Sequence, residues 1–200
     1  GCTALTSFPA GAQLGTAANN VNFASAWRSS GLTALPAGLD LSKANSLFNS
    51  FLNCTSLTTV GSGVLLGTAS SNVQFTQAFY GCTALTALPA GLDLGKGYDF
   101  QSAFQNCTSL VDFPTGAFDA LLAVTNNCFV DAWLGCTALS ATSVFNILSS
   151  IDTSTQSAPS GPQITIDYNV ATGALSAATN TAVTSLKSKG WVVIVNGTTL

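Results

Sequence analysis

A short motif centred on a cysteine recurs along this chain. The pentapeptide GCTAL occurs three times and its variant NCTSL twice, while a sixth, degenerate copy has Ser30 in the cysteine position. Successive copies lie roughly 25 to 29 residues apart, a period typical of repeat proteins. A unit of this length cannot bury an apolar face alone, so the chain is predicted to form one continuous solenoid. The motif cysteines are Cys2, Cys54, Cys82, Cys107 and Cys136.

Each unit has apolar residues seven, four and three positions before the cysteine and a leucine three positions after it. In the unit of Cys82 these are Phe75, Ala78, Phe79 and Leu85. Offsets of −7, −4, −3 and 0 lie on one face of a helix. The LTALP segment that follows is too short and too rich in threonine for a helix, and it fits a brief strand closed by proline. One or two helical turns followed by a short strand are therefore predicted for each unit.

Because each unit combines helical turns with a short strand, the stacked units are predicted to form an α/β fold. The strands should form a narrow parallel sheet, and the crossovers predict a right-handed coil. The solenoid is expected over 1–143, with about six rungs, and its first unit is cut, which suggests a piece excised from a longer protein. Residues 144–200 differ from the repeats and are expected to cap the last rung. The cap begins with a terminal helix, SVFNILSSI, and a polar loop over 154–162. A strand–helix–strand piece follows, made of ITIDY, a helix from Ser176 to Gly190, and WVVIV.

Connectors of two kinds join the units. QLGTAANNVNF and LLGTASSNVQF are long, whereas GLDLSK and GLDLGK are shorter. The longer period that they define indicates that the duplicated unit is a pair of rungs.

Six cysteines raise the question of disulfides. Because five of them occupy one repeat position, where the sixth copy has serine, a small residue in a narrow buried slot is the favoured interpretation. The alternative is a bridge between neighbouring rungs, such as Cys82 to Cys107, which the rung spacing permits. Cys128 is outside the pattern. It is expected at the start of a helix and is predicted to be the most reactive or surface-near thiol.

The composition limits the partners of the chain. Only 6% of the residues are charged, the formal net charge is −3, and histidine is absent. A chain without a basic stripe is not expected to bind nucleic acid or anionic membranes. No stretch approaches the roughly 18 apolar residues of a membrane span, so membrane insertion is not expected either.

No catalytic residue, cofactor or metal site is predicted. The lack of histidine excludes Ser-His-Asp and Cys-His nucleophiles and the common zinc sites. The aspartates are isolated; Asp40 and Asp93 share a connector position but should lie two rungs, about 10 Å, apart, and are interpreted as solvated turn residues. Trp27 and Trp133 fall in the aromatic column and are expected in the core.

The exposed side of the strand ladder is the predicted contact surface, because solenoids bind partners on extended sheet faces. The alternative is that the long connectors make the contacts, and Tyr80 and Tyr98 are the aromatic side chains expected to be more exposed. The regular threonines also suggest ice binding, although strand preference and backbone bonding explain them as well. The predicted ligand-binding face comprises Thr6, Ser7, Thr33, Thr58, Thr59, Thr86, Val111 and Asp112.

The combination of AFxxCTSL and a following LTxxP resembles the BspA-type leucine-rich repeats of bacterial surface proteins and of bacteriophage tail and virion proteins. Residues 78–85 and 103–110 carry the match, which extends over roughly 1–142. The chain departs from the pattern in its unequal rung lengths and in gaps in the aromatic and cysteine columns. The resemblance implies a leucine-rich-repeat solenoid.

For function, the resemblance implies a non-enzymatic recognition or attachment module outside the cell, without a cofactor. The partners so implied are a host-surface protein or glycan, other virion or surface proteins, and further copies of the chain. The low charge and the richness in Ala, Thr, Gly and Ser favour a phage tail fibre or other virion appendage. A bacterial secreted or cell-surface adhesin and a structural assembly subunit without a ligand remain as alternatives.

Overall fold

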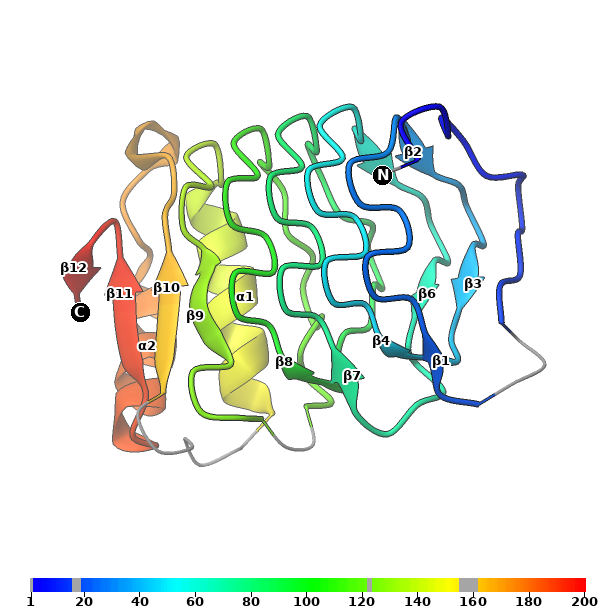
Figure 1. The fold of residues 1–200 in the computed structure, drawn as a ribbon. Helices are drawn as coiled ribbons and strands as arrows, with labels where there is room; N and C mark the ends of the chain where they lie inside the picture. The colour runs from blue at the N-terminus through cyan, green and yellow to red at the C-terminus, as the bar shows by residue number, and fades with distance from the viewer. Residues whose placement is uncertain (1, 16–18, 122–123, 155–161) are drawn as a thin grey trace.

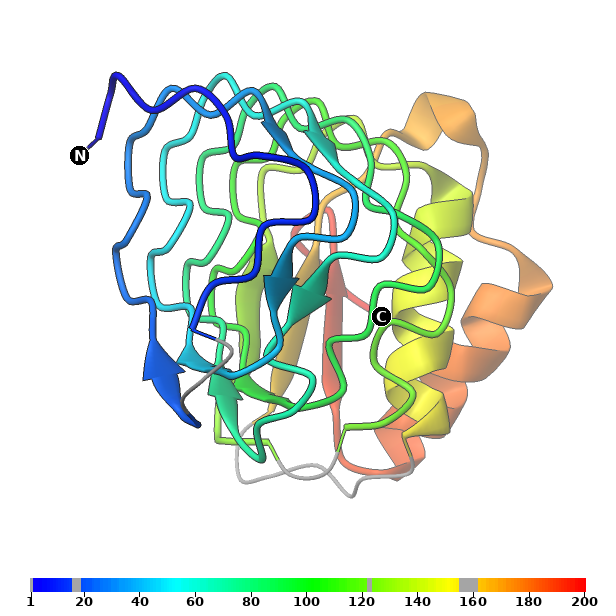
Figure 2. The same cartoon turned by 90° about the vertical axis from the view of Figure 1, so that its right-hand side faces the viewer.

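The protein has a mixed α/β fold with short parallel strands and few helices. A computed structural model describes residues 2–15, 19–121, 124–154 and 162–200. Over these residues the chain winds through successive coils that lie side by side, and the C-terminal helices and strands close one end of the stack (Figure 1). Seen at 90° to this view, the coils nearly superimpose around a common interior (Figure 2).

Three narrow parallel sheets run along the stack. The largest has the order β1-β4-β7-β8, and each of its strands belongs to a different coil. Its strands are β1 (Val21–Asn22), β4 (Ala44–Ser46), β7 (Val73–Gln74) and β8 (Gly97–Asp99). The two smaller sheets pair β2 (Ala34–Leu35) with β5 (Thr59–Val60), and β3 (Asp40–Leu41) with β6 (Leu65–Leu66).

Between the largest sheet and the cysteine, each coil makes a zigzag of tight turns. In the coil of Cys82, the N–H groups of Ala78 and Cys82 donate to carbonyls three residues back, at 2.9 and 3.2 Å. The N–H groups of Gln77 and Phe79 donate instead to the next coil, at 2.9 and 2.8 Å. The predicted helical turns are therefore wrong for the repeats. A zigzag that turns every four residues buries nearly the same positions as a helix, but its backbone bonds alternate between tight turns within the coil and bonds to the next coil.

Positive φ angles mark this zigzag. In each coil they occur at two positions, the fifth and the first residue before the cysteine or before Ser30. A backbone with positive φ is left-handed, and this conformation favours glycine and asparagine. This conformation explains why the motif begins with Gly or Asn. The residues at −5 are Ser25, Asn49, Gln77, Ser102 and Asp131, and those at −1 are Ser29, Asn53, Gly81, Asn106 and Gly135.

Aromatic rings form continuous columns in the interior, as the repeat predicts. One column contains Trp27, Phe51, Phe79, Phe104 and Trp133, whose successive ring centroids are 5.1, 5.1, 5.4 and 6.1 Å apart with nearly parallel planes. The expected core position of both tryptophans is confirmed, since both are buried. A second column contains rings stacked at 5.0 and 5.3 Å, from Phe75, Phe100 and Phe129.

The cysteines are free thiols, and the alternative bridge from Cys82 to Cys107 is not formed. Cys128 is fully buried immediately before a strand, so the prediction of a surface-near thiol at a helix start is wrong. Cys128 is buried directly before Phe129, which is itself buried and belongs to the second aromatic column. The exposed thiol among the described residues is instead Cys2.

The C-terminal segment joins the last coil through a sheet of order β12-β11-β10-β9. Helix α1 begins after the N-cap Ser140, three residues before the expected boundary at 144. Helix α2 has the predicted N-cap Ser176, and it connects the parallel strands β10 and β11, as expected for the cap. Residues 155–161 of the predicted loop lie outside the described residues. The elements are β9 (Phe129–Trp133), α1 (Ala141–Thr153), β10 (Gln163–Ile166), the 3-10 helix η1 (Val170–Thr172), α2 (Ala177–Ser188), β11 (Val192–Val195) and β12 (Thr198–Thr199).

Candidate functional site

Four threonines on adjacent coils form a continuous row, here called the threonine ladder: Thr6, Thr33, Thr58 and Thr86. The N–H groups of Thr33, Thr58 and Thr86 donate to the carbonyl of the preceding threonine, at 3.1, 2.9 and 3.1 Å. Their hydroxyls donate to the same carbonyls, at 3.3, 2.9 and 3.3 Å. These three side chains are therefore held in one orientation along the stack. All four are exposed.

The other residues of the predicted binding face lie beside or beyond this ladder. Val111 continues the row, since its N–H donates to the Thr86 carbonyl at 2.9 Å, and its side chain is 40% exposed. Isolated bridges join Thr59 to Ala87 and Ala87 to Asp112. Ser7, Thr59 and Asp112 are exposed as well. The structure thus brings the predicted residues onto consecutive coils, and their role in binding stays a prediction.

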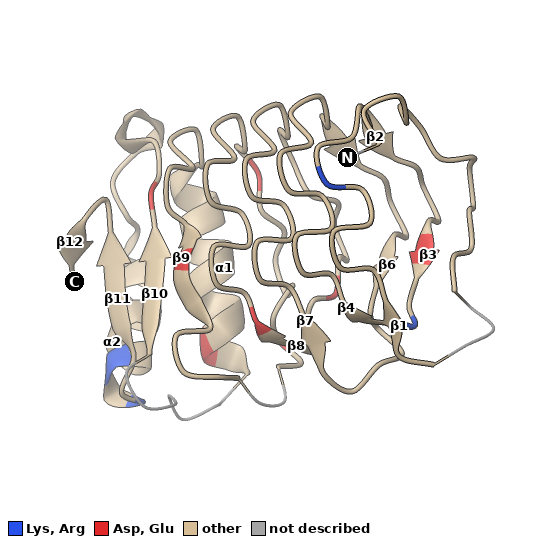
Figure 3. Cartoon of the chain, viewed as in Figure 1, with Lys and Arg blue, Asp and Glu red and all other residues tan. Residues whose placement is uncertain are grey.

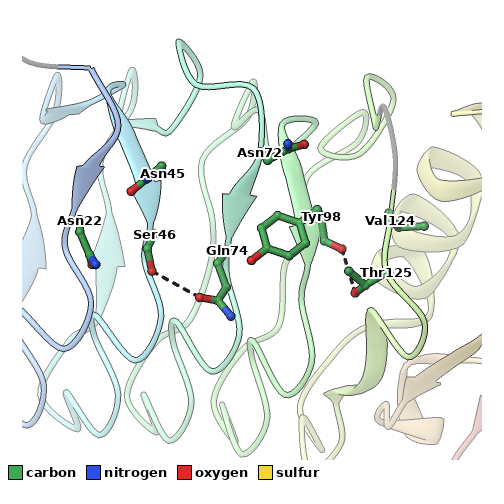
Figure 4. A pocket seen from close by; sticks show the side chains of 8 residues that line it. All are labelled: Asn22, Asn45, Ser46, Asn72, Gln74, Tyr98, Val124 and Thr125. Atoms are coloured by element: carbon green, nitrogen blue, oxygen red, sulfur yellow. Dashed lines mark hydrogen bonds between the residues drawn. The ribbon is translucent and has the colours of Figure 1, made fainter.

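A second surface is a groove across the β1-β4-β7-β8 sheet, with a volume of about 580 Å³ (Figure 4). None of the residues that line it is charged. We did not predict this groove from the sequence. The sequence suggested only that the long connectors could form the contact surface and that the Tyr98 ring would be exposed. Its lining consists of Asn22, Asn45, Ser46, Asn72, Gln74, Tyr98, Val124 and Thr125.

Two backbone bulges shape this groove. Val21 and Asn22 pair with Ala44 and Ser46, so Asn45 is an extra residue in β4. In the same way Tyr98 is the extra residue in β8, between Gly97 and Asp99. Bulges re-aim side chains and often lie next to functional sites. In the sequence, the two bulges fall in the segments KANS and KGYD. Each of these segments begins with the lysine that ends a shorter connector, and the two lie two coils apart.

The aspartates serve the backbone and neighbouring hydroxyls. Asp40 and Asp93 each accept the N–H two residues ahead at 2.8 Å. Asp93 is exposed, as predicted, whereas Asp40 is half-buried in β3, so the prediction of a solvated turn residue is wrong for Asp40. Asp119 accepts the Ser150 hydroxyl at 2.7 Å, and Asp167 accepts the Gly135 N–H at 2.9 Å. In the part of the chain that the structure describes, no group of three or more metal-ligating side chains occurs. Charged residues are scattered along the chain (Figure 3).

The buried thiols are poor nucleophiles. Burial raises the pKa of the Cys82, Cys107 and Cys128 thiols well above their ordinary value. Burial also raises the pKa of Cys136 to about 12, against an opposing hydrogen bond from the Cys107 backbone. These thiols stay protonated at neutral pH, and a thiol reacts as its thiolate.

Among the helices that the structure describes, none has the length and apolar character needed to cross a membrane. Comparison of the chain with family models, with curated proteins and with solved structures finds no match in any of the three.

Proposed function

We propose that this chain is a non-enzymatic attachment module that binds a protein or glycan on a host surface through the threonine ladder and its neighbours. In this proposal the stack of coils is a right-handed leucine-rich-repeat solenoid of the BspA type. The module belongs to a phage tail fibre or another virion appendage, and it acts outside the cell.

The observation that carries the proposal is the regular exposure of the predicted face. Thr6, Thr33, Thr58 and Thr86 project from successive coils, and their backbones are bonded to one another across the stack. Because the backbone and the hydroxyl of Thr33, Thr58 and Thr86 are fixed, these three side chains lose little entropy on binding. A preorganised surface of many weak, neutral contacts suits attachment, where several copies bind together.

The chemistry of the remaining side chains supports a non-enzymatic role. The thiols of Cys82, Cys107, Cys128 and Cys136 are held protonated, as described above. Asp40, Asp93, Asp119 and Asp167 accept structural hydrogen bonds, so their carboxylates already serve the fold.

Cell binding tests the proposal. The purified chain, labelled with a fluorophore, is titrated onto candidate host cells. Replacing both Thr58 and Thr86 with arginine puts two bulky charges at the centre of the ladder and is expected to weaken binding at least about tenfold. The matched control replaces Thr181 and Thr184, which are exposed on α2, with arginine and retains binding.

Two outcomes would overturn the proposal. Unchanged binding of the ladder variant would move the contact surface elsewhere. A blank titration at high concentration, in a chain that still assembles into particles, would favour the assembly subunit.

A further inference from the structure

The groove across β1, β4, β7 and β8 offers neutral polar groups on a fixed floor. We propose that it is a binding site for a neutral oligosaccharide. The inference rests on the proposed function only for its biological setting. It concerns a surface other than the threonine ladder, so either site can fail without the other.

The first argument is hydrogen-bonding capacity. Sugar hydroxyls both donate and accept, and side-chain amides are the groups that can answer both. Within the described part of the chain, the Asn72 side-chain amide and the Tyr98 hydroxyl have no protein partner. The side-chain oxygen of Asn22 accepts the Ala24 N–H at 2.8 Å. This bond fixes the side-chain amide and leaves its nitrogen free to donate. Gln74 accepts the Ser46 hydroxyl at 3.5 Å, a long bond that a ligand hydroxyl can replace.

The second argument is the position of an aromatic ring. Tyr98 reaches from the bulge in β8 towards Gln74 (Figure 4). Tyr98 is half-buried, and it lines the groove. A tyrosine combines an apolar ring with a polar tip. The C–H face of a sugar ring can pack on such a surface while its hydroxyls reach the amides.

The third argument is that the lining residues carry no charge and that three backbone carbonyls along the groove already have partners. An acidic sugar would find no cationic partner among the lining residues. A peptide strand would need unpaired backbone groups. Three carbonyls along the groove are already occupied, because those of Ser46, Gln74 and Tyr98 accept N–H groups of adjacent coils at 2.9, 2.8 and 2.9 Å.

The extent of the groove favours an oligosaccharide over a single sugar. It extends over four adjacent strands, from Asn22 in β1 to Tyr98 in β8, and beyond to Thr125. Four strands about 4.8 Å apart cover about 14 Å, which is longer than one sugar ring.

A panel of soluble oligosaccharides tests the inference. The chain is screened against neutral glycans containing glucose, galactose, mannose or N-acetylglucosamine, and against sialylated counterparts. Hits are titrated by calorimetry and by NMR, in which amide shifts locate the site without any mutation. Neutral glycans are expected to bind and to shift amides of Gln74 and Tyr98.

Groove variants then assign the contacts. Tyr98→Ala is expected to weaken binding about three- to tenfold, as loss of one ring contact implies. Tyr98→Phe, which keeps the ring, should weaken it less. Asn72→Arg on the exposed rim adds bulk without disturbing the core and should also weaken binding. Tyr80→Ala is the matched control, because Tyr80 is half-buried outside the groove, and it should bind as the unmodified chain does.

Three results of the screen would overturn the inference. They are no binding of any glycan at millimolar concentration, a preference for sialylated glycans, and NMR amide shifts confined to residues outside the groove. Binding that tolerates Tyr98→Ala and Asn72→Arg would do the same. Because the panel uses soluble sugars and groove variants, its result is independent of the cell-binding test on the ladder.

Discussion

The thiol of Cys82 donates to the carbonyl oxygen of Phe51 in the preceding coil at 3.1 Å, and the same carbonyl accepts the N–H of Cys54 at 3.1 Å. Cys107 repeats this bond on Phe79 at 3.1 Å. The cysteine is thus a small donor that joins consecutive coils in a dry interior. Ser30, in the degenerate coil, is the other small residue type with a donor at this position, and it contacts the Cys54 sulfur at 3.2 Å.

The first prediction compares two replacements of Cys82. Valine fills the slot but cannot donate and adds a branch, so Cys82→Val is expected to cost about 1–3 kcal/mol of unfolding free energy. Cys82→Ser keeps the donor and should cost less. Urea unfolding followed by circular dichroism measures both. A serine variant less stable than the valine variant would show that apolar volume, and not donation, decides this position.

The second prediction concerns alkaline pH. Burial raises the pKa of Cys136 to about 12 in the folded chain, from an ordinary value of 9.0. The neutral thiol is therefore favoured by folding. Its contribution is complete below about pH 9 and is lost as the pH rises towards 12, with a slope approaching about 1.4 kcal/mol per pH unit for one thiol. Urea unfolding between pH 8 and 11 should show a shallower decline for Cys136→Ser than for the unmodified chain. The exposed Cys2 supplies the control, because Cys2→Ser should leave the slope unchanged. Identical slopes for all three proteins would contradict the prediction.

The third prediction concerns the alternation of Asn and Gly before the cysteines. A Cβ atom added at Gly81 would clash with the Asn53 side-chain oxygen of the neighbouring coil, in addition to its positive φ. Gly81→Ala should therefore cost about 1–3 kcal/mol, mainly through the backbone conformation. Because the exposed Asn53 side chain can turn aside, this cost should fall by only about 0.5 kcal/mol when Asn53 is glycine. A double-mutant cycle measured by denaturant unfolding gives this coupling.

Gly91 supplies the control for the cycle. It has a positive φ but no atom within 4 Å of an added Cβ. Gly91→Ala should thus show the backbone cost without coupling to Asn53. Equal coupling at both glycines would refute steric contact as the reason for the alternation.

The fourth prediction concerns the two helices of the cap. The Lys189 ammonium group contacts the Asp152 carboxylate at 2.6 Å, and both side chains are only about a quarter exposed, 25% and 23%. Because this partly shielded pair joins α2 to α1, Lys189→Ala should lower the unfolding free energy by about 1 kcal/mol, and less in high salt. Lys187→Ala, at an exposed position in the same helix, should change stability little. Thermal unfolding at two salt concentrations checks this, and equal effects at Lys187 and Lys189 would show that the pair contributes nothing.

The sequence predicted correctly those features that a periodic pattern fixes. The aromatic columns and the free thiols follow from repetition, because equal residues at equal positions stack when coils stack. The elements of the cap follow from local signals, such as the N-cap Ser176 and the alternation in ITIDY.

The prediction from periodicity was wrong where two backbone geometries bury the same residue positions. Offsets of −7, −4, −3 and 0 fit a helix, yet Gln77 and Gly81 have positive φ and the chain turns every four residues. The prediction of a surface-near Cys128 was wrong for a related reason. Cys128 does not occupy a repeat position, so the repeat pattern could not show that it is buried.

The sequence by itself determined that this protein is a stack of similar units, since each unit carries an apolar face that only another unit can cover. The tertiary structure alone decided where the neutral groove lies. Asn45 and Tyr98 are far apart in sequence, and two bulges that depend on the register between coils bring their side chains to one surface. Register is a property of pairing between segments, and no single segment encodes it.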